Sequence, residues 1–278
     1  MVAELISVGT EILLGNIVNT NAAYLAEKCA LLGLSLYHQS VVGDNEARME
    51  DTIRRALERS DVVILTGGLG PTKDDLTKEV TAKVFKKALC EDAHTKERIM
   101  EFFQKIHNGE KITENNWKQA LIPEGAIIVE NQNGTAPGLI VIGDEGSGYE
   151  GKRAILIPGP PNECIPMFET QIAPYLSDLQ PEGIYSSMVK VCAIGESRAE
   201  TMVADLMDAQ TNPTLAPYAK TGEVHFRVTA KAKDEESAKC LMAPMLEELK
   251  KRFGDHIYTT KEEVTLEEAV IQMLEERK

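Results

Sequence analysis

A glycine-rich segment at residues 66–75, Thr-Gly-Gly-Leu-Gly-Pro-Thr-Lys-Asp-Asp, constrains the fold of this chain more than any other feature. It follows residues 61–65, an apolar and largely β-branched run that predicts a buried strand. After it, residues 76–85 carry apolar side chains near helical spacing. The segment is therefore a turn between the carboxyl end of a strand and the start of a helix. In an open α/β sheet, ligands bind at such turns.

The composition of this turn indicates a phosphate site. Glycines allow backbone N–H groups to approach an anion closely, and a helix start adds partial positive charge. The turn lacks the terminal Gly-Lys-Ser/Thr of a Walker A loop and does not fit the dinucleotide motif Gly-x-Gly-x-x-Gly. The residues of the turn expected to contact a phosphate are Gly67, Gly68, Gly70, Pro71 and Thr72.

Two adjacent aspartates, Asp74 and Asp75, close the turn. Carboxylates fit a bare phosphate site poorly, but they fit one in which a metal ion mediates between carboxylates and phosphates. The alternative is that they cap the following helix, where negative charge interacts favourably with the helix dipole. Capping explains one aspartate better than two, so we expect a divalent metal ion at Asp75 and Asp74.

Alternating segments before the turn predict a parallel sheet. Strands are expected at residues 2–8, 34–42 and 61–65, with helices at 20–32 and 46–59. This order gives a mostly parallel sheet covered by helices on both faces. Helical segments are expected over residues 76–121, including 96–107, then strands at 126–130, 138–142 and 153–157 and a helix ending near residue 175.

The pattern changes near residues 178–183, where Pro181 and Gly183 lie between two periodic regions. Beyond them, the order β-α-β-β-α-β predicts a small α+β domain, closed by an amphipathic helix at residues 265–278. The expected strands are 187–194, 214–218, 223–231 and 257–259, and the expected helices are 198–207 and 235–253.

Charge and cysteine usage limit the class of partner. The formal net charge of −14 argues against a nucleic-acid binder or a protein of acidic membrane surfaces, since both need basic surface. No apolar run approaches the roughly 20 residues of a membrane span, and the N-terminus lacks a basic leader region. The five cysteines are scattered and form no CxxC pair, which favours a reducing cytoplasm over a disulfide framework or zinc site.

Three further groups of residues lie in loops that follow or precede strands of the predicted sheet. Gly9, Thr10 and Glu11 come directly after the first strand, where they form either a capped turn or a ligand contact. Asp44 follows the second strand, in a Gly-Asp-Asn turn whose Asn45 can cap the next helix. The last group consists of Asn133, Gly134 and Thr135 from one loop and Pro158, Gly159 and Glu163 from another. Each loop alone is explained by turn formation, but loops that follow one sheet can converge on one site.

Taken together, GTEILLG, GGLGPTKDD, NGTAPG and PGPPNE, in this order, resemble the CinA family (competence/damage-inducible protein A). The resemblance covers residues 1 to about 260. It implies a three-layer α/β/α domain at residues 1–179, similar to the molybdopterin-binding proteins MogA and MoaB, and a small KH-like α+β domain at 180–262. Residues 263–278 would be the first helix of a nicotinamide mononucleotide deamidase domain, and no deamidase activity is expected from the sequence given.

The resemblance also implies an activity. In characterised relatives the first domain is a metal-dependent pyrophosphatase that cleaves ADP-ribose to AMP and ribose 5-phosphate, and the family is usually dimeric. By resemblance, Asp75 and Asp44 are the expected catalytic residues, Thr77 joins the phosphate-binding set, and the metal is Mg, Mn or Co. MogA-type proteins usually read Gly-Gly-Thr-Gly where this chain has Leu69, which disfavours a pterin ligand. Molybdopterin binding and a non-catalytic nucleotide-sensing or dimerisation role remain the alternatives.

Overall fold

The computed structural model describes residues 1–106, 112–179 and 182–276, and the chain divides into two compact units, Met1–Gln180 and Pro181–Lys278. The expected domain boundary after residue 179 adjoins residues 180–181, which lie outside the described residues. Each unit has its own hydrophobic core. None of the helices in the described ranges combines the length and apolarity that a membrane span requires.

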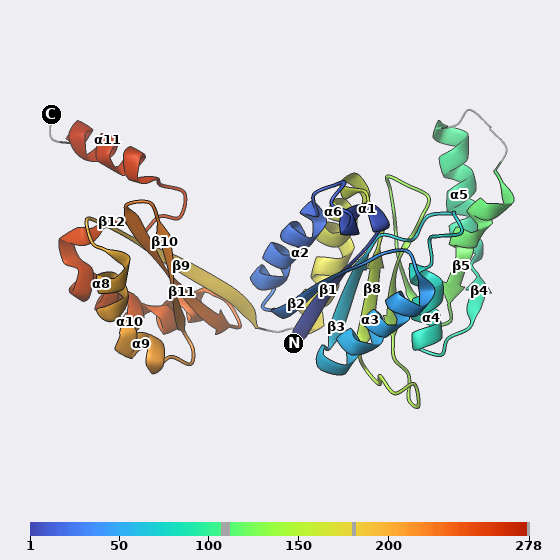
Figure 1. The fold of residues 1–278 in the computed structure, drawn as a ribbon, viewed down its shortest axis with the longest axis horizontal. Helices are drawn as coiled ribbons and strands as arrows, with labels where there is room; N and C mark the ends of the chain where they lie inside the picture. The colour runs from blue at the N-terminus through green and yellow to red at the C-terminus, as the bar shows by residue number, and fades with distance from the viewer. Residues whose placement is uncertain (107–111, 180–181, 277–278) are drawn as a thin grey trace. The chain divides into compact units, whose positions relative to one another are not determined.

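The first unit contains a six-stranded sheet with the strand order β2-β1-β3-β8-β7-β6 (Figure 1). Its strands are β1 (Val2–Val8), β2 (Ser35–Val42), β3 (Val62–Thr66), β6 (Ile127–Val129), β7 (Gly138–Ile142) and β8 (Arg153–Ile157). The neighbours β2, β1, β3 and β8 run parallel, whereas β7 is antiparallel to both β8 and β6. The predicted mostly parallel sheet is confirmed.

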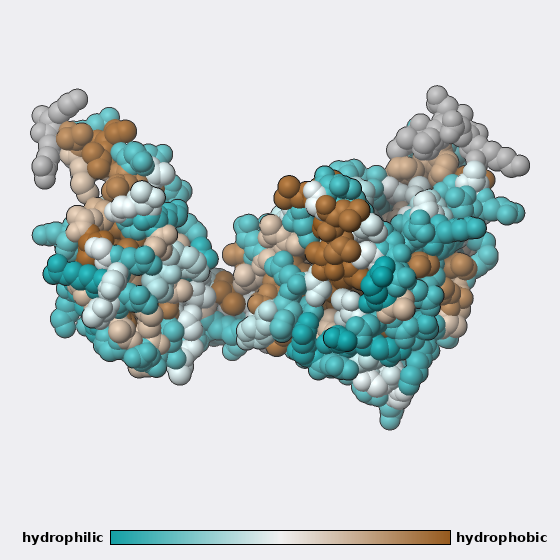
Figure 2. Space-filling view, in the orientation of Figure 1, coloured by the Kyte–Doolittle hydropathy of each residue, from teal (hydrophilic) through white to brown (hydrophobic). Residues whose placement is uncertain are grey.

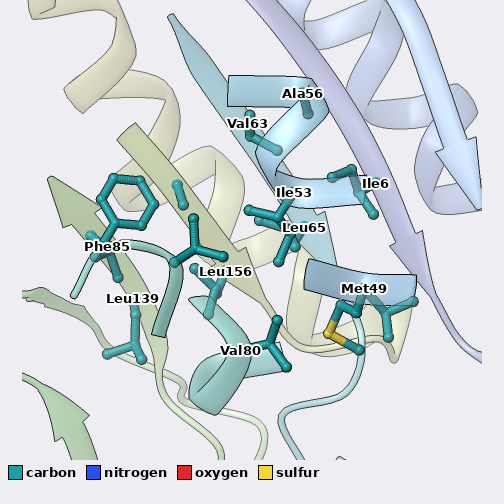
Figure 3. Packing of buried hydrophobic residues seen from close by; sticks show 14 of the residues in the cluster. Ile6, Met49, Ile53, Ala56, Val63, Leu65, Val80, Phe85, Leu139 and Leu156 are labelled. Carbon is teal, nitrogen blue, oxygen red and sulfur yellow. The ribbon is translucent and has the colours of Figure 1, made fainter. Parts of the chain in front are cut away.

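Helices cover both faces of this sheet (Figure 1). Along β3, Val63 and Leu65 pack in one core cluster with α3 and α4, while Val62 and Ile64 pack in another with α2 and α6 (Figure 3 shows the first cluster). These helices are α2 (Thr20–Leu31), α3 (Glu46–Arg59), α4 (Thr77–Val84) and α6 (Pro161–Met167), the last continued by the π-helix η2 (Phe168–Ile172) and α7 (Ala173–Leu179). Because β3 is buried on both faces, it reads as an unbroken apolar run. The predicted three-layer architecture is confirmed.

The segment between α4 and β6 differs from the sequence prediction. Besides the expected helical segments, here α5 (Ala93–Ile106) and the 3₁₀ helix η1 (Glu114–Ala120), it contains a two-stranded sheet of β4 (Leu89–Glu91) with β5 (Leu121–Pro123). Strands of three residues are too short to show a period of two, and their pairing is a non-local event. A one-turn helix, α1 (Thr10–Leu13), was likewise not predicted. His107, the expected end of the helix at 96–107, lies outside the described residues.

The second unit is an antiparallel sheet with the strand order β10-β11-β9-β12. Its elements are β9 (Gly183–Cys192), α8 (Glu196–Thr201), α9 (Ala204–Asp208), β10 (Thr214–Lys220), β11 (Glu223–Ala232), α10 (Glu235–Phe253), η3 (Gly254–His256), β12 (Ile257–Thr259) and α11 (Leu266–Glu276). The predicted order is confirmed, with the first helix broken into α8 and α9. Phe226 stacks on Phe253 at 4.8 Å between ring centroids, which ties α10 to the sheet. The expected last residues of α11, 277–278, lie outside the described residues.

Candidate functional site

The loops singled out in the sequence meet at one edge of the first sheet. Because β2, β1, β3 and β8 are parallel neighbours, the loops that begin at Gly43, Gly9, Gly67 and Pro158 leave from the same edge. The loop at residues 130–137 joins β6 to β7, and since β7 runs antiparallel to β8 this loop also lies at that edge. This convergence is what the position of ligands in open α/β sheets requires.

A cavity of about 900 Å³ lies among these loops. Its volume falls within the range of ~300–1,000 Å³ that is typical of small-molecule sites. The residues expected at the site that line the cavity are Gly9, Glu11, Asp44, Gly67, Gly68, Gly70, Pro71, Thr72, Asp74, Asp75, Asn133, Gly134, Thr135, Pro158, Gly159 and Glu163. Thr10 and Thr77 do not line it and instead contact the loops from behind.

Backbone carbonyl groups of the glycine-rich turn are held on the protein side. The buried Thr77 hydroxyl donates to the Gly67 carbonyl oxygen at 2.8 Å, and the Thr77 N–H donates to that of Gly68 at 3.1 Å. The Gln119 amide, from η1, lies 3.4 Å from the Leu69 carbonyl oxygen. In a trans peptide the carbonyl and the next N–H point in opposite directions. The N–H groups of Gly68, Leu69 and Gly70 are therefore directed away from these anchors.

These three consecutive N–H groups belong to residues that line the cavity and can together hold an anion, an arrangement of the kind called a nest. None of them donates a hydrogen bond to another described residue. Gly67 and Gly68 adopt φ angles of 96° and 66°, which favour glycine. Space is also limiting, because a Cβ on Gly67 would lie 2.3 Å from the Val8 carbonyl oxygen and one on Gly68 would lie 2.2 Å from the Thr77 hydroxyl. Leu69 is buried in the core, so the turn is also anchored by packing.

The two acids expected to be catalytic, Asp75 and Asp44, hold their loops in the same way. Asp75 Oδ2 accepts the N–H and the hydroxyl of Thr72, at 2.9 and 2.5 Å. Asp44 Oδ2 accepts the N–H and the hydroxyl of Thr10, at 3.0 and 2.7 Å. In both residues Oδ1 accepts no hydrogen bond from a described residue, which leaves one carboxylate oxygen for a ligand.

The capping alternative is resolved for each of these turns. Helix α4 begins after Leu76 without a side-chain cap, so neither Asp74 nor Asp75 caps it. Asn45 does cap α3, since its side-chain oxygen accepts the Arg48 N–H at 3.1 Å. The sequence pattern was thus open to capping at both turns, and the structure shows it at one.

Two lysines brace the glycine-rich turn from outside the cavity. Lys118 Nζ donates to the carbonyl oxygens of Thr72, at 3.0 Å, and of Asp75. Lys78 Nζ in turn donates to the Lys118 carbonyl oxygen at 2.5 Å. Burial lowers the pKa of Lys78 to about 8. Sequence reasoning missed Lys118 and Gln119, because nothing in their local pattern marks a residue of η1 as a neighbour of a turn over 40 positions away.

The opposite wall joins the loop at residues 130–137 to the start of α6. Asn131 Nδ2 donates to Glu163 Oε2 at 2.6 Å, and Asn133 Nδ2 donates to the Asn162 carbonyl oxygen at 2.6 Å. Burial raises the pKa of Glu163, and the Asn131 hydrogen bond opposes that change. Gly134 fits closely here, because a Cβ would lie 2.3 Å from Glu163 Oε2.

The charges around the cavity have one sign. Five carboxylate side chains line it: Glu11, Asp44, Asp74, Asp75 and Glu163. Among the described residues, no lysine, arginine or histidine lines it. Within the described ranges, no three His, Cys, Asp or Glu side chains form a metal-binding group. Magnesium is commonly held by one or two carboxylates together with substrate phosphates. The free oxygen of Asp75, with one further carboxylate from Asp44 or Asp74, fits that shared mode rather than a cage made by protein alone.

Comparison with protein families matches residues 4–178 to a probable molybdopterin binding domain and residues 186–259 to the damage-inducible protein CinA KH domain. A putative competence-damage inducible protein of Clostridium beijerinckii is 49% identical over 278 residues, covering 100% of this chain and 66% of that protein. A CinA-like protein of Dictyoglomus turgidum is 50% identical over 277 residues, covering 100% of this chain and 65% of the relative. The chain thus spans about two thirds of the length of these relatives.

A solved structure with a similar fold is the protein CinA, described as of unknown function, from Thermoplasma acidophilum. It shares 36% sequence identity with this chain and superposes with a TM-score of 0.53. The match covers 62% of this chain and 97% of the other.

Proposed function

The chain belongs to the CinA family, with a molybdopterin-binding-type domain followed by a CinA KH domain, and on that premise we propose that its first unit is a metal-dependent hydrolase of nucleoside diphosphate sugars. The substrate we propose is ADP-ribose or a close analogue, cleaved at the pyrophosphate to AMP and ribose 5-phosphate. The second unit contributes no residue to the lining of this cavity, and we propose that it serves assembly. We expect the protein to act as a homodimer in the cytoplasm.

One observation carries this proposal: three unpaired N–H groups of a glycine turn lie in a cavity whose only charged lining residues are acids, among the described residues. An anion-binding nest favours phosphate, whereas five carboxylates oppose an anion that arrives alone. A diphosphate that brings a divalent cation satisfies both features, since the cation lies between the two sets of negative charge. A neutral ligand would leave the nest without a partner.

The chain's own residues then have separate roles. The N–H groups of Gly68, Leu69 and Gly70 would hold phosphate oxygens and the negative charge that develops on them. Asp75 Oδ1, with one further carboxylate from Asp44 or Asp74, would hold a divalent ion, which when bound neutralises phosphate charge and activates water for attack. The second carboxylate oxygens of Asp75 and Asp44 fix the loops, so the free oxygens are preorganised.

The groups on either side of the diphosphate would be enclosed by the remaining loops. Asn133 and Thr135 line the cavity from one loop, and Pro158 to Glu163 line it from the other. Glu163 Oε2 accepts from Asn131, which holds this carboxyl group at the cavity wall, and burial raises its pKa. Gly9 and Glu11 close the site beside the first strand.

The test is to incubate the purified chain with ADP-ribose and Mg²⁺, Mn²⁺ or Co²⁺ in turn and to measure AMP. We expect AMP and ribose 5-phosphate in equal amounts with at least one metal, and a large loss in Asp75→Asn. Asp51→Asn is the matched control, because Asp51 is an exposed acid on α3 paired with Arg55, away from the cavity. No product with any of the metals, or full activity in Asp75→Asn, would refute the proposal.

A second candidate function is binding of molybdopterin, favoured by the family match over residues 4–178. The same nest could hold the pterin phosphate. Parallel titrations with molybdopterin and ADP-ribose distinguish the two candidate functions, because the ligand that binds more tightly indicates which function the site serves. Tight ADP-ribose binding without turnover would instead favour a nucleotide-sensing role.

A further inference from the structure

A second, smaller cavity opens beside the candidate site. Its volume is about 120 Å³, room for about four water molecules at ~30 Å³ each, so it can hold one group of a ligand but not a whole nucleotide. Three residues, Phe102, Gly134 and Thr135, line both cavities. The remaining lining residues come from α5 and from residues 128–137, and they include Thr95, Arg98, Glu101, Lys105 and Glu130. We call it the side cavity.

The charge of the side cavity is balanced, unlike that of the main cavity. Two cations, Arg98 and Lys105, face two acids, Glu101 and Glu130. A ligand group with a net charge would be attracted by one pair and repelled by the other. The balance therefore favours a neutral polar group.

Arg98 is held in one orientation by three neighbours. Its Nε lies 3.2 Å from Glu130 Oε2, and Nη2 donates to the Asn131 carbonyl oxygen at 3.1 Å and to Gln132 Oε1 at 3.3 Å. Nη1 has only a 3.7 Å approach to Glu101 Oε2, too long for a hydrogen bond. The guanidinium is thus fixed in place with one nitrogen left to donate.

Thr95, on the same helix, contributes a buried hydroxyl that has no hydrogen-bond partner among the described residues. An unpaired buried polar group is uncommon and costs about 1–3 kcal/mol. A threonine in a helix has two accessible χ1 rotamers, so a bound hydroxyl group in the side cavity can recruit this one by rotation.

The position of the side cavity across the sheet indicates which end of a ligand it receives. The glycine-rich turn follows β3, at the middle of the strand order β2-β1-β3-β8-β7-β6, and the side cavity lies by β6 and β7. Ile17 and Val18 line the main cavity from the loop that follows β1, the neighbour of β3 on the side away from β6, and are 52% and 84% exposed (Figure 2 shows apolar surface in this region). An apolar end suits a nucleobase, and a polar, neutral end suits sugar hydroxyls, which both donate and accept.

We propose that the side cavity binds the terminal sugar of the nucleoside diphosphate sugar, with Arg98 and Thr95 as hydrogen-bonding residues that set specificity for that sugar. This inference rests on the proposed function. It orients the ligand from the base at Ile17 and Val18, through the diphosphate at the glycine-rich turn, to the sugar beside α5. ADP-ribose then binds more tightly than ADP because only ADP-ribose fills the side cavity.

The experiment is calorimetric titration of the full chain with the non-hydrolysable α,β-methylene analogues of ADP-ribose and ADP, in Mg²⁺. Arg98→Gln is expected to weaken ADP-ribose-analogue binding about tenfold, the effect of losing one hydrogen bond from a charged donor, and to leave ADP-analogue binding within about twofold. Thr95→Val keeps the side-chain shape and is expected to weaken only the ADP-ribose analogue, without lowering the melting temperature of the free protein. Lys96→Gln is the control, since it removes a cation from α5 outside both cavities.

Equal weakening for both analogues would place the nucleotide end in the side cavity and overturn the proposal. Unchanged binding of the ADP-ribose analogue in both variants would also overturn it. Because the readout is binding, a wild-type chain that binds the analogue but never hydrolyses ADP-ribose refutes the hydrolase and leaves this proposal to be decided by the variants. A wild-type chain that does not bind the analogue refutes both.

Discussion

Thr77→Val tests how the glycine-rich turn is organised. Thr77 is fully buried, and its hydroxyl donates to the Gly67 carbonyl oxygen at 2.8 Å. Valine has nearly the same shape but no hydroxyl, so the substitution leaves that carbonyl without its partner. An unsatisfied buried acceptor costs about 1–3 kcal/mol. The carbonyl no longer has a fixed direction, so the N–H of Gly68, on the other side of the same peptide, loses its fixed direction toward the cavity.

Two measurements are needed, because stability and ligand binding are both affected. Urea unfolding is expected to show the 1–3 kcal/mol loss of stability, and titration with ADP-ribose and Mg²⁺ is expected to show about tenfold weaker binding, or ~1.4 kcal/mol. Thr81→Val is the matched control. Thr81 is also fully buried, and its hydroxyl donates to the Thr77 carbonyl oxygen at 2.7 Å, one turn farther from the cavity.

The two variants should therefore differ in their affinity for ADP-ribose. Thr81→Val is expected to lose comparable stability while it keeps its affinity for ADP-ribose. If Thr77→Val binds ADP-ribose as tightly as Thr81→Val does, the direction of the Gly67 carbonyl does not organise the anion site, and the reasoning is refuted.

Four other outcomes follow from the same geometry. Lys118→Met removes the donor to the Thr72 and Asp75 carbonyl oxygens. It is expected to lower the free energy of unfolding by about 2 kcal/mol and to weaken diphosphate binding in titrations. Lys118→Arg keeps a donor and should restore part of the stability and part of the affinity. Lys78, with its pKa lowered to about 8 by burial, is charged in both states below pH 8, where the cost of burying its charge is present in full. Between pH 8 and the ordinary value of 10.5 the unfolded chain holds a proton that the folded chain has released, so stability rises with pH. Measured by urea unfolding, the free energy of unfolding of the wild type should rise by about 3 kcal/mol relative to that of Lys78→Met between pH 7 and 10.5. A difference between the two proteins that stays constant over this pH range would contradict the argument. Gly134→Ala forces a Cβ to 2.3 Å from Glu163 Oε2 and should displace that carboxylate, seen as weaker ADP-ribose binding with a small loss of melting temperature. Chelation of divalent metal by EDTA should weaken ADP-ribose binding by roughly three orders of magnitude, because cation–anion contacts near 4 Å contribute on the order of 4 kcal/mol at a protein surface. Calorimetric binding that does not depend on metal would count against the charge argument.

Local signals in the sequence were sufficient for most elements of the fold. Helix α10 begins and ends where predicted, because Asp234 caps its start and Gly254 follows its end. Strand β3 and the turn after it are likewise specified by neighbouring residues. The short strands β4 and β5 were missed because their pairing joins segments about 30 residues apart, and three residues carry no readable period.

The site was predictable to the extent that it consists of turns at one sheet edge. Sixteen of the expected residues line the main cavity. They could be predicted because glycine, asparagine and aspartate mark turns in any sequence. The residues that brace those turns were not predictable. Lys118 and Gln119 act from a 3₁₀ helix whose position depends on tertiary packing. Thr77 was expected among the phosphate-binding residues, but its hydrogen bond to the Gly67 carbonyl oxygen, ten residues earlier, was not. Side cavities of this kind depend on how α5 packs against the loop at residues 130–137, which no local pattern encodes.

The central claim is that the nest of N–H groups and the aspartates bind a metal-bound diphosphate together. A crystal structure of the full chain with Mn²⁺ and α,β-methylene ADP-ribose tests it most directly, since manganese is located by its anomalous signal. The account predicts phosphate oxygens within hydrogen-bond distance of the Gly68 to Gly70 N–H groups and manganese bound to Asp75 Oδ1. A diphosphate located away from that turn, or manganese without an Asp75 contact, would contradict it.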